Sequence, residues 1–184
     1  MKYFFKIALM LTFFMAPWSG TCLPADIELI RERMLDNLLK TEVNDAEIGE
    51  LIETLKPDGT WPGINYEDVS REGFEHRIHH GNMVQLSRAY RAKSSEYYQS
   101  EEVIKTIESA LKHWVEKDYI CDNWWHNQIG TPNNMVNLML LVGDELPGAL
   151  VEKAQPIIGR ATINAPGARP GGDRIKIASI HAKN

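Results

Sequence analysis

Apolar residues recur at three- and four-residue intervals through most of the chain, and strict alternation of apolar and polar residues is almost absent. Intervals of this kind are typical of α-helices that bury one face. The pattern therefore predicts an all-α protein with very little strand. Helices are expected over about 26–39, 45–55, 74–93 or 80–93, 100–115, 132–142, 147–156 and from 175 onward.

Residues at the ends of these stretches are typical of helix boundaries. Asp45, Ser100 and Thr131 are predicted N-terminal caps, because their side-chain oxygens suit the free amides of a first turn. Pro156 is expected to end or kink its helix. The 132–142 stretch is apolar on nearly every side, so this helix should be among the most buried.

Two irregular stretches, residues 56–63 and residues 166–172, interrupt the helical pattern. Residues 56–63 contain two prolines and two glycines, which predicts a turn cluster. Trp61 and Tyr66 follow in this region, and we expect them to cover the core rather than bind a ligand. Successive helices joined by loops suit a bundle, a helical repeat or a barrel of helix hairpins, and periodicity alone does not decide among them.

The charge of the chain excludes one class of partner. The 184 residues carry a formal net charge of -5 and have a pI near 5.7. No local run of lysine and arginine compensates, so a nucleic-acid surface is not expected. Two cysteines cannot build a disulfide framework or a cysteine zinc site, so packing must stabilise the fold.

Residues 1–22 have the features of an export signal. Lys2 and Lys6 precede an apolar run that is too short to span a bilayer comfortably. A membrane anchor and a lipidated Cys22 are alternatives, and we rank both below simple export. The sequence thus predicts a secreted or periplasmic protein, with no membrane contact after the signal is removed. The mature domain is expected to occupy residues 23–184.

A tandem tryptophan lies among amides in the connection before the 132–142 helix. Adjacent residues on a helix point about 100° apart, so one core stripe cannot easily bury both indoles. A sugar site needs flat apolar faces and bidentate amides. The alternative is that one indole packs under the loop while the amides cap helices. The predicted glycan-binding residues are Asn123, Trp124, Trp125 and Asn127, with Gln128 as a further amide.

Two other clusters could carry chemistry. His76, His79 and His80 have the i, i+3, i+4 spacing of a metal site, but no carboxylate completes a known spacing, so we favour a polar helix start facing solvent. The second cluster is the glycine-rich stretch 167–174, whose Arg169 and Arg174 could bind a carboxylate or a sulfate. The alternative is an ordinary loop with a helix start at Asp173 and Arg174. The stretch lacks the spacing of a P-loop, and no cofactor or metal is expected.

The strings Asn123–Pro132 and Leu55–Trp61 together resemble the N-terminal catalytic domain of polysaccharide lyase family 8, the chondroitin AC, hyaluronate and xanthan lyases. This resemblance implies an incomplete α/α toroid whose cleft binds an acidic polysaccharide and, in the complete enzyme, cleaves it by β-elimination beside a uronic acid. The tandem tryptophans would form the aromatic patch that holds the sugars. Arg169 stands where the family carries its catalytic Asn, and is a departure from that pattern.

The family's catalytic His and Tyr lie beyond the region of resemblance, so none of the six histidines is assigned to proton transfer. The chain ends at Asn184 without a cap or polar tail, which we interpret as truncation. We therefore expect a monomeric N-terminal fragment that is inactive alone. A non-catalytic glycan-binding helical protein and a purely structural helical domain are the alternatives.

Overall fold

The computed structural model describes residues 24–164 and 171–184, so the predicted export segment and Arg169 lie outside the described residues. Within these ranges the chain is helical and contains no strand, which confirms the predicted all-α class. None of the described helices is both long and apolar enough to cross a bilayer. The α-helices are α1 (Pro24–Leu38), α2 (Asp45–Thr54), α3 (His76–Arg91), α4 (Glu101–Lys117), α5 (Thr131–Val142), α6 (Gly148–Ile158) and α7 (Gly172–Lys183), with a π-helical turn at His126–Gly130 and a 3-10 turn at Gly143–Glu145.

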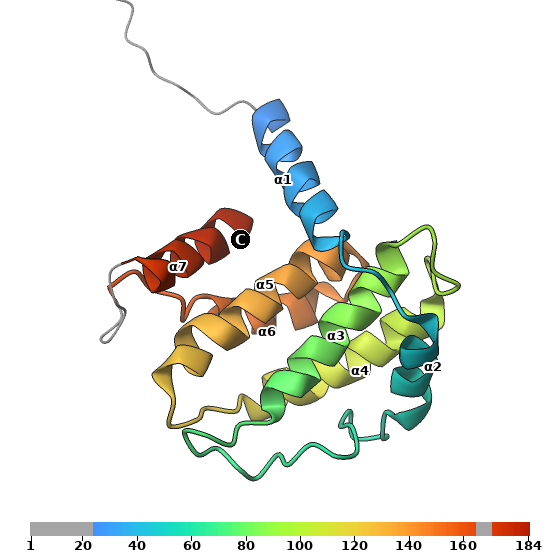
Figure 1. Ribbon diagram of the computed structural model, residues 1–184, viewed down its shortest axis with the longest axis horizontal. Coiled ribbons are helices and arrows are strands. Elements are labelled where there is room, and N and C mark those ends of the chain that lie inside the picture. The colour runs from blue at the N-terminus through green and yellow to red at the C-terminus, as the bar shows by residue number, and fades with distance from the viewer. Residues whose placement is uncertain (1–23, 165–170) are drawn as a thin grey trace, which may run out of the picture.

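The four helices α3 to α6 form two stacked hairpins. α3 and α5 run side by side in the same direction, α4 returns against α3, and α6 returns against α5 (Figure 1). α4 also contacts α6, so the second helices of the two hairpins lie together in one outer layer. α2 covers one side of the first hairpin, and α7 crosses beside α5 and the π-helical turn.

Helix α4 begins and packs as its sequence predicts. The Ser100 hydroxyl accepts a hydrogen bond from the backbone N–H of Val103 at 3.5 Å, which makes Ser100 the N-cap. Two acidic residues in the first turn favour the positive end of the helix dipole. The apolar stripe is completely shielded from solvent and consists of Val103, Ile107, Leu111 and Trp114.

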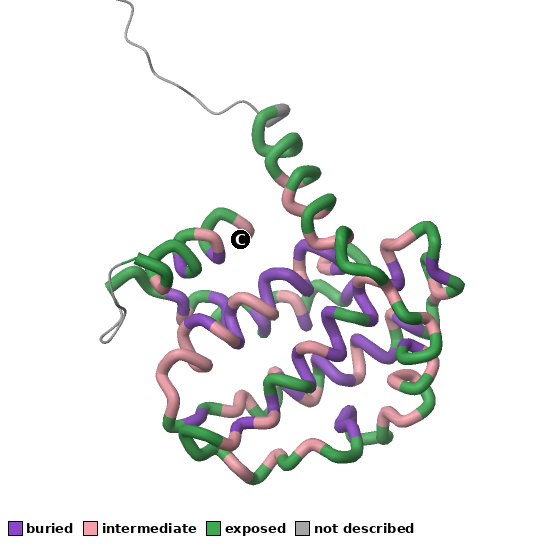
Figure 2. The backbone as a smooth tube through the Cα atoms, viewed as in Figure 1, coloured by how far each residue is buried: buried purple, intermediate pink, exposed green. Residues whose placement is uncertain are grey.

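The core lies between the two hairpins, where buried backbone follows α3, α4 and α5 (Figure 2). α5 is buried on most of its surface, as its uninterrupted apolar sequence predicts. Leu138 and Leu141 have no exposed surface, and neither does Leu86 of α3 opposite them. Burying one such leucine contributes about 2 kcal/mol, so this layer is a principal source of stability.

The turn cluster before α3 places Trp61 in the core. The Asp58 carboxylate accepts hydrogen bonds from the backbone N–H and the hydroxyl of Thr60, which closes the turn. Gly59 has a φ of +80°, and a Cβ there would lie 2.5 Å from the Ser109 carbonyl oxygen, so only glycine fits. Trp61 is 2% exposed and donates from Nε1 to the Leu51 carbonyl at 2.8 Å. The prediction that Trp61 covers the core is confirmed.

The predicted cap of α2 is wrong. Asn44, not Asp45, caps α2 by accepting from the Ala46 N–H, while the Asp45 carboxylate accepts from Ser95 in the loop before α4. Pro156, near which the sequence predicts that α6 ends or kinks, lies inside this helix, which ends two residues later at Ile158. The two isoleucines that follow Pro156 are each 2% exposed, so their burial favours continuing the helix past the proline.

The predicted buried face of the first helix is uncovered in its N-terminal half and half-buried in its C-terminal half. α1 projects away from the stacked hairpins, and only its C-terminal half approaches α5 (Figures 1 and 2). Ile27 is 59% exposed and Ile30 is 45% exposed. Helical periodicity correctly predicts the helix but cannot say whether an element lies opposite its apolar stripe.

Candidate functional site

The tandem tryptophan lies on a helix that begins earlier than the sequence predicts. Trp124 and Trp125 already have helical backbone, and a π-helical turn from His126 to Gly130 leads directly into α5. Thr131 is therefore inside the helix, and the prediction that it is an N-cap is wrong. The Thr131 N–H donates to the His126 carbonyl, five residues back, which is the hydrogen bond that defines this turn.

The π-helical turn brings Trp125 against Gly130. A Cβ at Gly130 would lie 2.9 Å from Cζ3 of the Trp125 ring and 3.3 Å from Nδ1 of His126. The indole therefore occupies the space that any side chain larger than hydrogen would need. Turns of this type occur frequently at functional sites, and here the wider turn fixes the orientation of an aromatic ring.

Asn123 is the N-cap that the helix uses in place of Thr131. Its Oδ1 accepts from the backbone N–H of Trp125 at 3.1 Å. Its Nδ2 donates to the Arg71 carbonyl at 3.5 Å, across to the loop before α3. The amide thus holds the start of the Trp-Trp segment against a distant part of the chain. A direct contact of Asn123 with a sugar stays a prediction.

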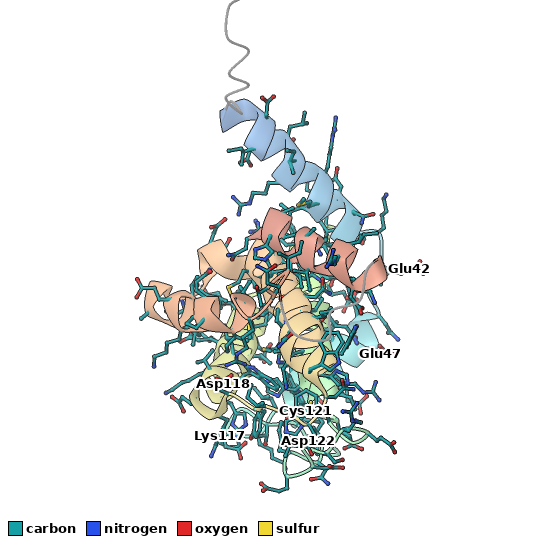
Figure 3. The ribbon with its side chains drawn as sticks, turned by 90° about the vertical axis from the view of Figure 1, so that its left-hand side faces the viewer. Glu42, Glu47, Lys117, Asp118, Cys121 and Asp122 are labelled. Carbon is teal, nitrogen blue, oxygen red and sulfur yellow. The ribbon has the colours of Figure 1, made fainter. Side chains whose placement is uncertain are left out.

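Asn127 braces the entry to the same segment. Its Oδ1 accepts from the Cys121 N–H at 3.1 Å, and its Nδ2 donates to the Cys121 carbonyl at 2.7 Å. Both ends of the amide therefore bind one backbone residue, which fixes the loop between α4 and the π-helical turn. Figure 3 shows Cys121 and Asp122 in this loop, at the end of the molecule opposite α1. Sugar binding by Asn127 likewise stays a prediction.

The two indoles have different surroundings. Both are half-buried and pack against the core on one side. Trp125 also lines a pocket of about 260 Å³, together with residues of α3, α5 and α7, and Trp124 is not among the lining residues. The ring that a ligand in this pocket would meet is therefore Trp125.

The three histidines of α3 are buried, contrary to the solvent-facing helix start that the sequence suggested. His76 and His79 have no exposed surface, and His80 is 2% exposed. Desolvation by burial is the main effect that lowers the pKa of each, to about 3 for His79. Aromatic rings from the preceding loop and from α4 surround them, including Trp61 and Trp114. Three histidines at helical spacing gave no indication in the sequence that their side chains would be buried among aromatic rings.

A chain of hydrogen bonds uses both nitrogens of His79. The Ala110 carbonyl can only accept, so Nε2–H of His79 donates to it at 3.1 Å. Nδ1 then accepts from the Tyr66 hydroxyl at 2.9 Å, and that hydroxyl accepts from the Trp61 N–H at 3.2 Å. Burial raises the pKa of Tyr66 to about 12. His79 and Tyr66 therefore join the turn cluster to α3 and α4 and have no free site for a metal.

A metal site is not apparent elsewhere either. Across residues 24–164 and 171–184, no group of three or more His, Cys, Asp or Glu side chains is arranged to hold a metal ion. Arg160, whose charge suits an anionic glycan, is instead paired with the Asp118 carboxylate at the end of α4. Arg174 lies exposed on α7 and does not line the pocket.

Stacked helix hairpins, with a half-buried tryptophan beside a pocket at one end, define an all-helical protein of the helix-hairpin class with a candidate ligand site. Comparison with known proteins makes this specific. Residues 26–176 match the family described as polysaccharide lyase family 8, N terminal alpha-helical domain. This chain belongs to polysaccharide lyase family 8, and its hairpins form an incomplete α/α toroid, as the resemblance implied.

Individual relatives agree with this assignment. The chain is 31% identical over 155 residues to chondroitinase-AC of Pedobacter heparinus, which covers 82% of this chain and 22% of the relative. It superposes on a chondroitinase AC lyase solved with oligosaccharides, with a TM-score of 0.75 and 29% identity over 85% of this chain and 23% of that one. A Paenibacillus xanthan lyase shares the fold, with a TM-score of 0.70 at 14% identity over 85% of this chain and 17% of that one. The chain thus spans less than a quarter of these relatives.

Proposed function

We propose that this chain forms part of the substrate cleft of a polysaccharide lyase and binds a uronic-acid-containing polysaccharide of the chondroitin, hyaluronan or xanthan type. The observation that carries the proposal is the position of Trp125, whose half-buried ring lines a pocket and is fixed by the π-helical turn. An indole face suits the C–H side of a sugar ring. The chondroitinase-AC relative supports the substrate class.

Cleavage by β-elimination makes three chemical demands. The uronate carboxylate must be neutralised so that C5 becomes acidic, a base must remove the C5 proton, and an acid must protonate the departing O4. The described residues meet the first demand better than the others. His79 and Tyr66 are fully engaged inside the fold, so neither can reach a substrate proton.

We therefore propose that proton transfer needs residues from the part of the family architecture that lies beyond the matched region. The matched region accounts for 22% of the chondroitinase-AC relative. Arg169, at the position similar to the family's catalytic Asn, is proposed to help neutralise the carboxylate. A guanidinium supplies a full positive charge and five N–H donors, whereas a side-chain amide supplies a dipole and two N–H donors.

A binding role without catalysis is the second candidate. Among the described residues that line the Trp125 pocket there is no tyrosine, and the histidines are His80 and His126. A pocket that has an aromatic wall and no phenol can hold a sugar without protonating a leaving group. In this reading the same tryptophan binds glycan, and the chain does not cleave it.

The site of action is part of the proposal. An exported, monomeric protein would meet polysaccharide outside the cytoplasm, as the N-terminal segment 1–22 predicts. Fractionation of cells that express the full sequence would show the chain in the periplasm or medium. Light scattering of the purified protein at several concentrations should give the mass of one chain.

The function is tested by oligosaccharide binding to single alanine variants. Calorimetric titration with chondroitin tetrasaccharide should show weaker binding for Trp125→Ala, by about 1 kcal/mol for the lost stacking contact. Trp124→Ala should weaken binding less, because Trp124 does not line the pocket. Helical circular dichroism should be retained in both. Loss of the helical spectrum in both variants would instead favour a purely structural role.

Controls separate binding from turnover. Tyr98→Ala removes a surface aromatic that is 38% exposed, in the loop before α4, and should bind like the original protein. Absorbance of unsaturated uronate products should not rise when the purified chain is incubated with chondroitin, hyaluronan or xanthan. Sustained turnover by this chain alone would refute the proposal that proton transfer lies elsewhere.

A further inference from the structure

The pocket beside Trp125 has a basic wall in an acidic protein. The chain has a formal net charge of -5, yet none of the described residues that line this pocket is an aspartate or a glutamate. The charged side chains among these described residues are Arg77 from α3 and Lys176 from α7. Two elements far apart in sequence thus bring their cations to one cavity, while the acidic side chains lie elsewhere.

Neither cation is neutralised by a neighbouring side chain. In the part of the chain that the structure describes, the side chains of Arg77 and Lys176 have no carboxylate within 4.0 Å, whereas Arg31, Arg91 and Arg160 each pair with one. Lys176 Nζ instead lies 5.0 Å from the centroid of the Trp125 ring. An ammonium over an indole keeps its charge available to a ligand that reaches the same ring.

The imidazoles of the pocket are suited to hydrogen bonding rather than to charge. Burial, and next the charge of Arg77, lower the pKa of His126. His80 also lines the pocket, and its buried Nε2 has no hydrogen-bond partner. A buried polar atom without a partner is costly, so a ligand oxygen that satisfied it would bind favourably. The Asn134 side chain adds an amide on the α5 side.

We propose that this pocket is an anion-binding subsite that holds a carboxylate or sulfate group of an acidic sugar, with Arg77 and Lys176 as its cationic contacts and Trp125 under the sugar ring. The inference rests on the proposed glycan-binding function and adds to it the place where an anionic group of the sugar binds and two recognition residues. Phe74 and Ile129 supply the apolar remainder of the wall. A cavity of about 260 Å³ can accommodate one charged sugar unit, so recognition here is of a single residue of the polymer.

The source of the anion is resolved with three tetrasaccharides that differ in charge. These are chondroitin 4-sulfate, hyaluronan, and chondroitin that has been desulfated and carboxyl-reduced. For Arg77→Ala and Lys176→Ala, we expect roughly three- to tenfold weaker binding of an anion-bearing ligand, since each exposed cation contributes a modest charge-assisted contact. A carboxylate site predicts this loss for both charged ligands, and a sulfate site predicts it only for chondroitin 4-sulfate. The neutral ligand should bind all variants equally.

Two matched variants control for the loss of charge itself. Arg71→Ala and Arg174→Ala each remove one exposed cation near the pocket without changing its lining. Both should bind the charged tetrasaccharides like the original protein. If they lose as much affinity as Arg77→Ala and Lys176→Ala, the effect is general electrostatic steering and the subsite proposal is wrong.

Inorganic sulfate gives a test that does not depend on sugar binding. Sodium sulfate should raise the thermal unfolding midpoint of the original protein above that in sodium chloride of equal ionic strength. The Arg77→Ala/Lys176→Ala double variant should show a smaller rise, which leaves only the general stabilisation that sulfate gives to folded proteins. If no tetrasaccharide binds but the rise is smaller in the double variant, the proposed function fails and the anion site stands. An equal rise in the original protein and the double variant, together with unchanged tetrasaccharide binding in both single variants, would overturn the subsite.

Discussion

Gly130 and Trp125 are in mutual contact across the π-helical turn, at a separation that leaves no room for a methyl group on Gly130. A Cβ on Gly130 would lie 2.9 Å from Cζ3 of Trp125, below the distances that Cβ atoms adopt. The position of the indole in the pocket therefore depends on a glycine that lines the same pocket but has no side chain to contact a ligand. The same contact makes the site sensitive to a conservative change five residues away.

Gly130→Ala should displace the Trp125 ring and weaken oligosaccharide binding by roughly 1 kcal/mol, the size of one stacking contact. Alanine is a better helix former than glycine, so the helix itself should not suffer. Tryptophan fluorescence should shift, with helical circular dichroism unchanged. Gly148→Ala is the control, because nothing lies within 4 Å of a Cβ at that helical glycine. Unchanged fluorescence and affinity in Gly130→Ala would contradict the prediction.

Asn127 should stabilise the loop at Cys121 through two hydrogen bonds, which two substitutions can remove one after the other. Asn127→Asp keeps the acceptor for the Cys121 N–H and loses the donor to the Cys121 carbonyl, whereas Asn127→Ala loses both. We expect the free energy of unfolding to fall by about 1 kcal/mol for the first variant and by about 2 kcal/mol for the second. Urea titration measures the series. Equal stability of all three proteins, with lower affinity for tetrasaccharide, would show that Asn127 contacts sugar instead.

Acid should destabilise the fold through His79. Burial lowers its pKa from an ordinary 6.5 to about 3, so between these values the unfolded chain binds a proton that the folded chain does not. The stability due to neutral His79 is complete above pH 6.5 and is lost as pH falls toward 3. One such group contributes a slope of about 1.4 kcal/mol per pH unit. Urea unfolding between about pH 7 and about pH 5 measures it.

A second histidine variant checks the origin of that slope. His181 lies exposed near the end of α7, so His181→Ala should keep the same dependence on pH. The His79 contribution adds to that of His80, whose pKa burial also lowers. A free energy of unfolding that does not change between about pH 7 and about pH 5 would show that these histidines are not buried in solution.

Cys121 should be protected from thiol reagents in the folded protein. The residue is 5% exposed, and burial raises the pKa of its thiol, so the reactive thiolate is scarce at neutral pH. We expect labelling by a maleimide to be slow in buffer and rapid in denaturant, with the labelled peptide identified by mass spectrometry. Rapid labelling of Cys121 in the folded protein would indicate that the loop before the π-helical turn opens readily.

The sequence predicts much of the helical framework because local features determine it. Ser100 caps α4 and the stripe ending at Trp114 is buried, as capping chemistry and periodicity require. His79 shows where such reasoning fails. Its burial depends on Tyr66 and Ala110, whose approach is a tertiary event that no local pattern encodes.

The candidate site was predictable in part for the same reason. A tandem tryptophan among amides indicated the segment, and the Asn123–Pro132 string indicated the family. The π-helical turn was not predicted, because its hydrogen bond, from the Thr131 N–H to the His126 carbonyl, spans only one residue more than an α-helical hydrogen bond. Lys176 was also missed, since only the packing of α7 beside α5 brings it to Trp125.

The π-helical turn also means that the position of Trp125 in the pocket depends on the number of residues between His126 and Gly130. Deleting one residue between His126 and Gly130 would allow an ordinary α-helical turn to form, with every side chain of the pocket wall in α3 and α7 still present. Everything before the deletion would then rotate by about 100° relative to α5. Trp125 would leave the pocket. A gap of one position in this segment of a related sequence would thus mark a protein that keeps the fold and has lost the tryptophan wall of this pocket.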